Sequence, residues 1–147
     1  MAPITGSVEI TRPPQDVFEY VADLSRQGEW QTGLEKVVVQ TEGPTRVGTK
    51  AVDTRHVPGG PRDIPYEITE CDAPRRLAFR VTDGPLRPEG SLTLTSLDNG
   101  TRTRVDFAME FHGHGLGVVL LPIANRDARK HVPGDMAALK QRLETPS

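Results

Sequence analysis

The order of the hydrophobic patterns along this chain constrains its fold more than any other feature. A helix-start signal, Pro13-Pro14-Gln15-Asp16, comes early; the stretch from Leu34 to His112 is patterned almost entirely as strands and turns; and one amphipathic helix closes the chain. This order predicts an antiparallel sheet curled around a single C-terminal helix. Such an arrangement leaves a cavity between sheet and helix, and a cavity implies a ligand.

The N-terminal segment predicts one strand and two short helices. Ser7 to Thr11 alternates polar and apolar residues, as a half-buried strand does. Pro13-Pro14 ends this strand and opens a helix that runs from about Pro14 to Ala22. Asp23 to Arg26 is typical of the cap of a second short helix, which ends near Trp30.

The segment after Leu34 contains further runs with the composition and alternation of strands. Turn residues such as Asp72-Ala73-Pro74 and Asp98-Asn99-Gly100 separate them, and Asn99-Gly100 is a strong hairpin signal. With the first strand, the sequence therefore predicts an α+β fold with a meander of about seven antiparallel strands. The runs are Val37–Val39, Lys50–Val57 before Pro58-Gly59-Gly60-Pro61, Ile64–Ile68, Leu77–Val81, Leu92–Leu94 and Val105–Phe111.

The closing helix presents one apolar face. At ~100° per residue, an arc of about 120° holds most of its apolar residues. Asn125 falls within the same arc, either as a polar contact for the ligand or as a sign that the assumed helical phase is off by one residue. Pro133 predicts a kink or break near His131-Val132. The residues of the arc are Leu121, Ala124, Ala128, Val132, Met136, Leu139 and Leu143.

Composition narrows the function classes. The 147 residues fit one domain, 1–147, and a net charge of -2 with both signs interspersed argues against a nucleic-acid partner. Met1 to Gly6 lacks a secretory signal, and the apolar run Val118–Leu121 is far too short to span a bilayer. We therefore expect a soluble cytoplasmic protein without stable membrane insertion, either monomeric or homodimeric. Arginine outnumbers lysine 14 to 4, which indicates a GC-rich bacterial genome.

Several segments resemble a known family. They are Ile10 to Phe18, Asp23 to Trp30, Val47-Gly48-Thr49, Tyr66 to Glu70 before Pro74 to Leu77, and the closing helix. Together they resemble the polyketide cyclase/dehydrase and lipid-transport family of the START-like, or Bet v 1-like, helix-grip superfamily (SRPBCC). The resemblance covers nearly the whole chain and implies the helix-grip fold. It specifies chemistry weakly, because that superfamily includes lipid carriers, hormone receptors and aromatase/cyclases.

No motif indicates a cofactor or a metal. His112-Gly113-His114 lacks further ligands at metal spacing and is interpreted as a surface turn. Cys71, the only cysteine, is placed on the Thr69 side of its strand, opposite Ile68, without a designated histidine partner. The glycine-rich turns lack the spacing of phosphate-binding loops. We therefore expect no cofactor and no metal.

Polar residues on the expected inner face suggest a site. Asp53 and Arg55 share one side of the Lys50–Val57 strand and either pair inside the cavity or lie on a solvated edge strand with Arg55 at the rim. Tyr66 can hydrogen-bond a ligand, donate a proton or simply pack.

Three functions remain open. The first is noncovalent binding of a small hydrophobic molecule, lipid-like or aromatic-polyketide-like. The second is a cofactor-independent cyclase or dehydratase that uses Tyr66, Asp53 and Arg55, and the third is a partner-binding module with a vestigial cavity. The predicted ligand-binding residues are Trp30, Asp53, Arg55, Tyr66, Phe79, Met109, Phe111, Leu121, Ala124, Asn125 and Ala128.

Overall fold

A curved antiparallel sheet forms the body of the computed structural model, which describes residues 3–57 and 59–145. Met1, Ala2, the predicted turn residue Pro58, Pro146 and Ser147 lie outside the described residues. The strands are β1 (Ile4–Ile10), β2 (Leu34–Val39), β3 (Lys50–Val57), β4 (Gly60–Asp72), β5 (Arg76–Val81), β6 (Glu89–Leu97) and β7 (Arg102–Glu110). The helical elements are α1 (Pro14–Ala22), η1 (Leu24–Glu29), η2 (Asp98–Gly100) and α2 (Gly117–Glu144), where η marks 3₁₀ helices.

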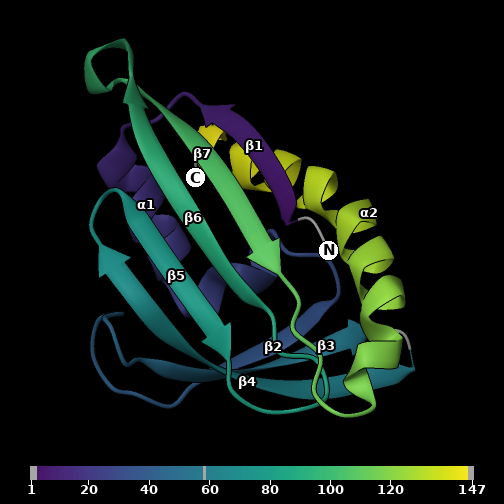
Figure 1. Cartoon of the computed structure of the whole chain (residues 1–147). Helices are drawn as coiled ribbons and strands as arrows, with labels where there is room; N and C mark the ends of the chain where they lie inside the picture. The colour runs from purple at the N-terminus through teal and green to yellow at the C-terminus, as the bar shows by residue number, and fades with distance from the viewer. Residues whose placement is uncertain (1–2, 58, 146–147) are drawn as a thin grey trace.

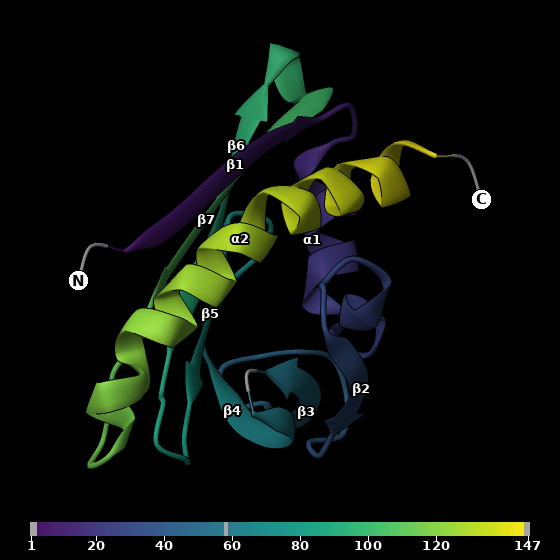
Figure 2. The same ribbon diagram turned by 90° about the vertical axis from the view of Figure 1, so that its right-hand side faces the viewer.

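The strand order is that of a meander with β1 added at one edge. Within the described residues, the seven strands run β1-β7-β6-β5-β4-β3-β2, each antiparallel to its neighbours (Figure 1). Hairpins join β2 through β7 in chain order, and β1 returns to pair with β7. This confirms the predicted α+β class and the helix-grip arrangement, in which α2 lies across the concave side of the sheet (Figure 2).

The two short N-terminal helices also follow the sequence signals. Pro14 opens α1, where its fixed φ suits a first helical turn and its missing N–H costs nothing. Asp23 caps η1 by accepting hydrogen bonds from the backbone N–H and the hydroxyl of Ser25, at 3.2 and 2.6 Å. η1 ends at Glu29, directly before Trp30, which places the single tryptophan under the sheet.

Two strands depart from the simple alternation, β2 between Leu34 and Lys36 and β4 near its C-terminal end. The β4–β5 register shifts between Ile68 and Glu70, so β4 contains a bulge there. Because an extra residue reverses which side chains face inward, Cys71 packs against the core on the same side as Ile68. The prediction that Cys71 lies opposite Ile68 was therefore wrong.

The C-terminal helix is continuous through both of its prolines, Pro122 and Pro133. Figure 2 shows that α2 bends about midway along its length instead of breaking. A proline removes one backbone hydrogen bond and crowds the preceding turn, which is a common cause of such a bend. The discontinuity predicted near His131-Val132 thus takes the form of a bend within one helix.

The C-terminal half of α2 is fastened to β1 and the residues after it. Arg12 Nη1 donates to the Leu143 carbonyl at 2.9 Å, and the Thr11 backbone N–H donates to Glu144 Oε2 at 2.8 Å. Gly6 of β1 lets the helix approach closely, since a Cβ built there would lie 2.5 Å from Val132 Cγ1.

Across residues 3–57 and 59–145, no helix is long and apolar enough to cross a bilayer.

Two glycine substitutions test this packing in opposite directions. Gly6→Ala should destabilise the fold by roughly 1 to 3 kcal/mol, because the new methyl group overlaps Val132. Gly134→Ala should stabilise it by about 0.5 to 1 kcal/mol, since Gly134 is a helical residue with no atom within 4 Å of its virtual Cβ. Urea unfolding of both variants beside wild type measures the difference. Equal effects at the two sites would contradict the close approach of α2 to β1.

Candidate functional site

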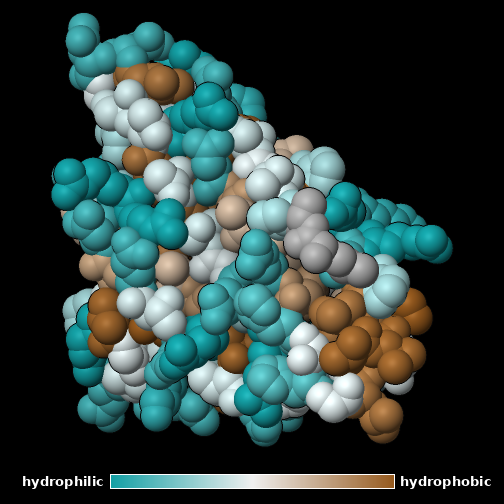
Figure 3. Space-filling view, viewed as in Figure 1, coloured by the Kyte–Doolittle hydropathy of each residue, from teal (hydrophilic) through white to brown (hydrophobic). Residues whose placement is uncertain are grey.

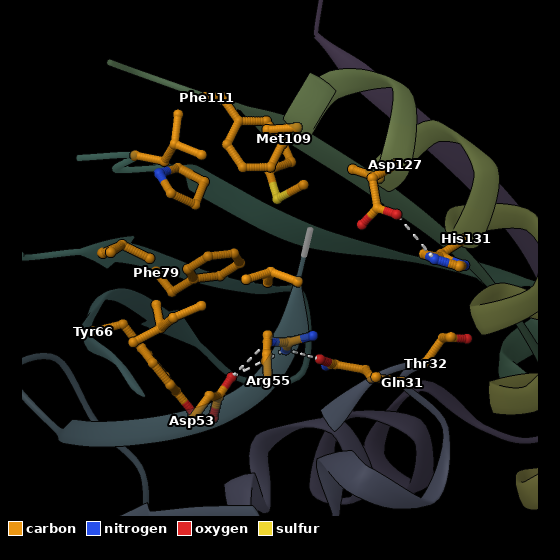
Figure 4. A pocket seen from close by; sticks show the side chains of 18 of the residues that line it. Gln31, Thr32, Asp53, Arg55, Tyr66, Phe79, Met109, Phe111, Asp127 and His131 are labelled. Atoms are coloured by element: carbon orange, nitrogen blue, oxygen red, sulfur yellow. Dashed lines mark hydrogen bonds and ion pairs between the residues drawn. The ribbon is translucent and has the colours of Figure 1, made fainter. Parts of the chain in front are cut away.

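A cavity of about 320 Å³ lies between the concave face of the sheet, η1 and the N-terminal half of α2. Strands β4 to β7 supply most of its apolar wall, and β3 supplies a polar end (Figure 4). In Figure 4 Met109 and Phe111 lie across the cavity from the Asp53 and Arg55 side chains. The apolar wall includes Ile64, Leu77, Phe79, Phe107, Met109 and Phe111.

The polar end is an ion pair that the fold removes from water. Asp53 is only 4% exposed, and its Oδ2 accepts from Arg55 Nη2 at 3.0 Å and from Arg55 Nε at 3.2 Å. Arg55 also donates to Gln31 Oε1 from the segment after η1. β3 lies between β2 and β4, so the alternative of a solvated edge strand is wrong. The Arg55 side chain keeps 27% exposure and reaches toward the cavity rim.

Tyr66 extends this polar end along β4. Its ring packs edge-on against Phe79, with centroids 6.1 Å apart, and its hydroxyl lies 3.5 Å from Gln27 Oε1. Burial raises the pKa of the Tyr66 phenol, and the nearby Asp53 carboxylate raises it further. The phenol therefore stays protonated across the physiological range and can donate a hydrogen bond.

The charge state of Asp53 reflects opposing effects. Burial raises the pKa of the Asp53 carboxyl above its ordinary value, and the positive charge and hydrogen bonds of Arg55 oppose that shift without cancelling it. A carboxyl group with this balance accepts a proton more readily than a surface aspartate. It can therefore serve as a hydrogen-bond acceptor or as a base.

Two buried polar atoms of the cavity lining have no hydrogen-bond partner within the described residues. They are Trp30 Nε1, a donor, and Asp53 Oδ1, an acceptor. Buried polar atoms are nearly always hydrogen-bonded, so such atoms in a cavity wall are candidates for contact with a bound molecule.

A second polar group lies on the helix side. His131 Nε2 is 3.4 Å from Asp127 Oδ1, one turn earlier on α2, and both residues line the cavity. The neighbouring Asp135 accepts from the Thr32 backbone N–H at 2.9 Å and from its hydroxyl at 2.6 Å, which ties α2 to the segment after η1. Sequence analysis missed these residues because none belongs to a motif, and because the contact of Thr32 with Asp135 joins segments far apart in the sequence.

Most of the predicted site residues line the cavity, and two do not. Leu121 is half-buried outside the lining, and buried Asn125 donates its Nδ2 to the Leu121 carbonyl at 2.9 Å within the helix. The assumed helical phase was therefore wrong for the first half of α2. The assumed phase suits the second half of α2, which packs against the core. The bend turns Ile123 and Asp127 of the first half toward the cavity. The predicted residues that line the cavity are Trp30, Asp53, Arg55, Tyr66, Phe79, Met109, Phe111, Ala124 and Ala128.

In the part of the chain that the structure describes, no group of three or more His, Cys, Asp and Glu side chains is placed to hold a metal ion. His112 and His114 lie just before the start of α2, and both are exposed.

A family model for polyketide cyclase / dehydrase and lipid transport proteins matches residues 1–144 of this chain. The chain belongs to this family. No curated protein sequence matches it significantly.

Solved structures of similar proteins share the family's fold. A protein of Thermus thermophilus aligns with 19% identity and a TM-score of 0.78 over 96% of each chain. The Zhui aromatase/cyclase of Streptomyces sp. R1128 aligns with 17% identity and a TM-score of 0.82, over 97% of this chain and 93% of that one. A START superfamily protein of Mycobacterium smegmatis aligns with 14% identity and a TM-score of 0.68 over 98% of each chain. At these identities the likeness is one of fold.

The raised pKa of Asp53 predicts a pH dependence of stability. The native state binds a proton at Asp53 more tightly than the unfolded chain does, so the stability contributed by this group is complete below about pH 3.8 and is lost as pH rises through the raised native pKa. The free energy of unfolding of wild type minus that of Asp53→Asn should therefore decrease over this interval and then level off. Urea unfolding of both proteins at a series of pH values measures it. An increase with pH would contradict the assigned direction.

Proposed function

We propose that this protein binds a small, mainly apolar molecule with a polar end, noncovalently, in the cavity between sheet and α2. The cavity itself is the observation that carries the proposal. Its volume of about 320 Å³ falls at the lower end of the range of ligand pockets, roughly 300 to 1,000 Å³. A partner-binding module with a vestigial cavity would instead have large side chains filling this space.

The lining supports a particular orientation of the ligand. Apolar side chains of β4 to β7 suit a hydrocarbon or aromatic body, and the end formed by Asp53, Arg55 and Tyr66 suits a polar group. Because Asp53 already pairs with Arg55, a neutral hydroxyl or carbonyl fits this end better than a second carboxylate. A lipid-like or aromatic-polyketide-like molecule with such a group meets both requirements.

A second candidate is a cofactor-independent dehydratase or cyclase. The raised pKa of Asp53 favours it, because a buried carboxylate of this kind can take a proton from a carbon beside a ketone. Protonated Tyr66 could then give its proton to a departing hydroxyl, which leaves as water while the new double bond forms, and Arg55 would orient the ketone. The name of the Streptomyces neighbour, an aromatase/cyclase, is consistent with this candidate.

The cellular setting is part of the same proposal. The proposal is of a bacterial, cytoplasmic carrier or enzyme, and the arginine-rich composition fits the bacterial origin. Homodimerisation is compatible with either candidate, and nucleic acid is not an expected partner at a net charge of -2.

Filling the cavity from the helix should block binding without unfolding the protein. Ala128 is half-buried in the cavity wall, so Ala128→Leu should lower the affinity for the neutral probe N-phenyl-1-naphthylamine at least fivefold and change stability little. Ala137→Leu, on the exposed side of the same helix, is the matched control. Fluorescence titration and thermal unfolding are the measurements. Unchanged probe binding in Ala128→Leu, or wild type that binds no probe, would contradict the proposed site.

Removing the Tyr66 hydroxyl should affect polar ligands selectively. Tyr66→Phe should weaken binding of 1-naphthol about two- to tenfold, the value of one hydrogen bond, and leave naphthalene unaffected in displacement of the same probe. Tyr20→Phe removes a buried hydroxyl that bonds Glu29 outside the cavity lining, and it should change neither affinity.

The same variants separate carrier from enzyme. Wild type that converts a β-hydroxy ketone into the unsaturated ketone, with the reaction abolished in Tyr66→Phe and retained in Tyr20→Phe, would establish the dehydratase. Equal affinities for 1-naphthol in wild type and Tyr66→Phe would remove Tyr66 from the site.

A further inference from the structure

Apolar side chains lie exposed where α2 begins. Leu116 is 85% exposed and Val119 is 73% exposed, and three neighbouring apolar residues are exposed as well. Figure 3 shows the resulting hydrophobic cluster at the corner of the molecule where Figure 1 places the first turns of α2. We call this cluster the α2 tip; it consists of Leu116, Val118, Val119, Leu120 and Ile123.

The α2 tip is held firmly against the loop between β5 and β6. His114 donates its backbone N–H to the Pro85 carbonyl at 2.9 Å, and Arg87 donates to the His112 carbonyl at 2.7 Å. Gly117 packs so closely that a Cβ there would lie 1.8 Å from the Pro85 carbonyl oxygen. These contacts fix the position of the first turn of α2. The apolar side chains of the α2 tip therefore stay exposed in the folded protein.

Cationic residues continue the same surface. At ~100° per residue, Val119, Ile123, Arg126 and Lys130 fall within an arc of about 60° on α2. Both cations are exposed, and neither forms an ion pair with any described residue. The acidic residue of this part of the helix, Asp127, lies on the cavity side and faces His131. The outer stripe therefore carries apolar groups at its start and positive charge directly behind them.

The chemistry of the stripe favours a lipid surface over another protein. An apolar tip backed by arginine and lysine matches a bilayer interface, where hydrocarbon lies beneath anionic headgroups. Leu120 and Ile123 also line the cavity, so the exposed surface is continuous with the ligand site.

We propose that the α2 tip docks this protein on anionic membranes, with its apolar side chains in the interface and Arg126 and Lys130 against the headgroups. Docking in this manner is peripheral and needs no membrane-spanning segment. It does not depend on the proposed ligand, since Leu116, Val118 and Val119 of the tip and both cations lie outside the cavity lining. If the ligand is lipid-like, docking places the cavity beside its source.

Vesicle sedimentation tests the proposal. Wild type should bind vesicles of phosphatidylglycerol and phosphatidylcholine and bind pure phosphatidylcholine vesicles much more weakly. Arg126→Gln/Lys130→Gln should lower the partition coefficient on anionic vesicles roughly 30-fold, and Leu116→Ser/Val119→Ser should lower it about tenfold or more. Both residues of the second pair lie outside the cavity lining, so N-phenyl-1-naphthylamine binding should be unchanged.

Matched variants elsewhere on the surface serve as controls. Val47→Ser alters an exposed valine in the loop between β2 and β3, and Lys36→Gln removes an exposed cation from β2. Both should bind anionic vesicles like wild type. Wild type that stays in the supernatant, or tip variants that sediment like Val47→Ser, would overturn the proposal. Sedimentation velocity showing a wild-type dimer that Leu116→Ser/Val119→Ser makes monomeric would also overturn it and make the tip an interface between two copies.

Discussion

The unequal seating of α2 on the sheet is the constraint on which the rest of the structure depends. Gly6 lets the second half of the helix touch β1, and Arg12 holds its end through the Leu143 carbonyl. The first half lies on the other side of the bend and packs against the β5–β6 loop, where Gly117 contacts Pro85. A straight helix packed along its whole length would bury its apolar face in the sheet. The bent helix instead leaves a cavity beneath its first half and exposed apolar residues at its start.

Placing the ion pair of Asp53 and Arg55 in this cavity costs desolvation free energy. A buried carboxylate loses much of its hydration, and a single arginine restores that loss only in part, as the raised pKa of Asp53 indicates. Two apolar residues in a sheet interior would cost nothing comparable. The pair therefore serves stability poorly, and its position in the wall opposite Met109 and Phe111 suits the recognition of a polar group (Figure 4).

Sequence analysis predicted the fold well because the fold depends on local signals. Period-two alternation between turn residues located the strands, and Pro14 and Asp23 marked the helix starts. The polar end of the cavity could also be predicted from the sequence, since Asp53 and Arg55 are polar residues on a side of β3 that was expected to face inward. The remaining features depend on nonlocal geometry. The bulge that turns Cys71 inward is specified by pairing with β5, and the phase error at Leu121 and Asn125 arises from a bend that a straight helical wheel does not include.

The cavity has a polar end and an apolar end, and the apolar end is continuous with the exposed surface of the molecule. Asp53 and Tyr66 form one end, whereas Phe111 on the opposite wall and Ile123 on α2 belong to the apolar region that continues into the exposed α2 tip. A ligand that places its polar group against Asp53 and Tyr66 therefore directs its apolar part toward the tip. For a molecule drawn from a bilayer, this path keeps the hydrocarbon against protein or lipid throughout.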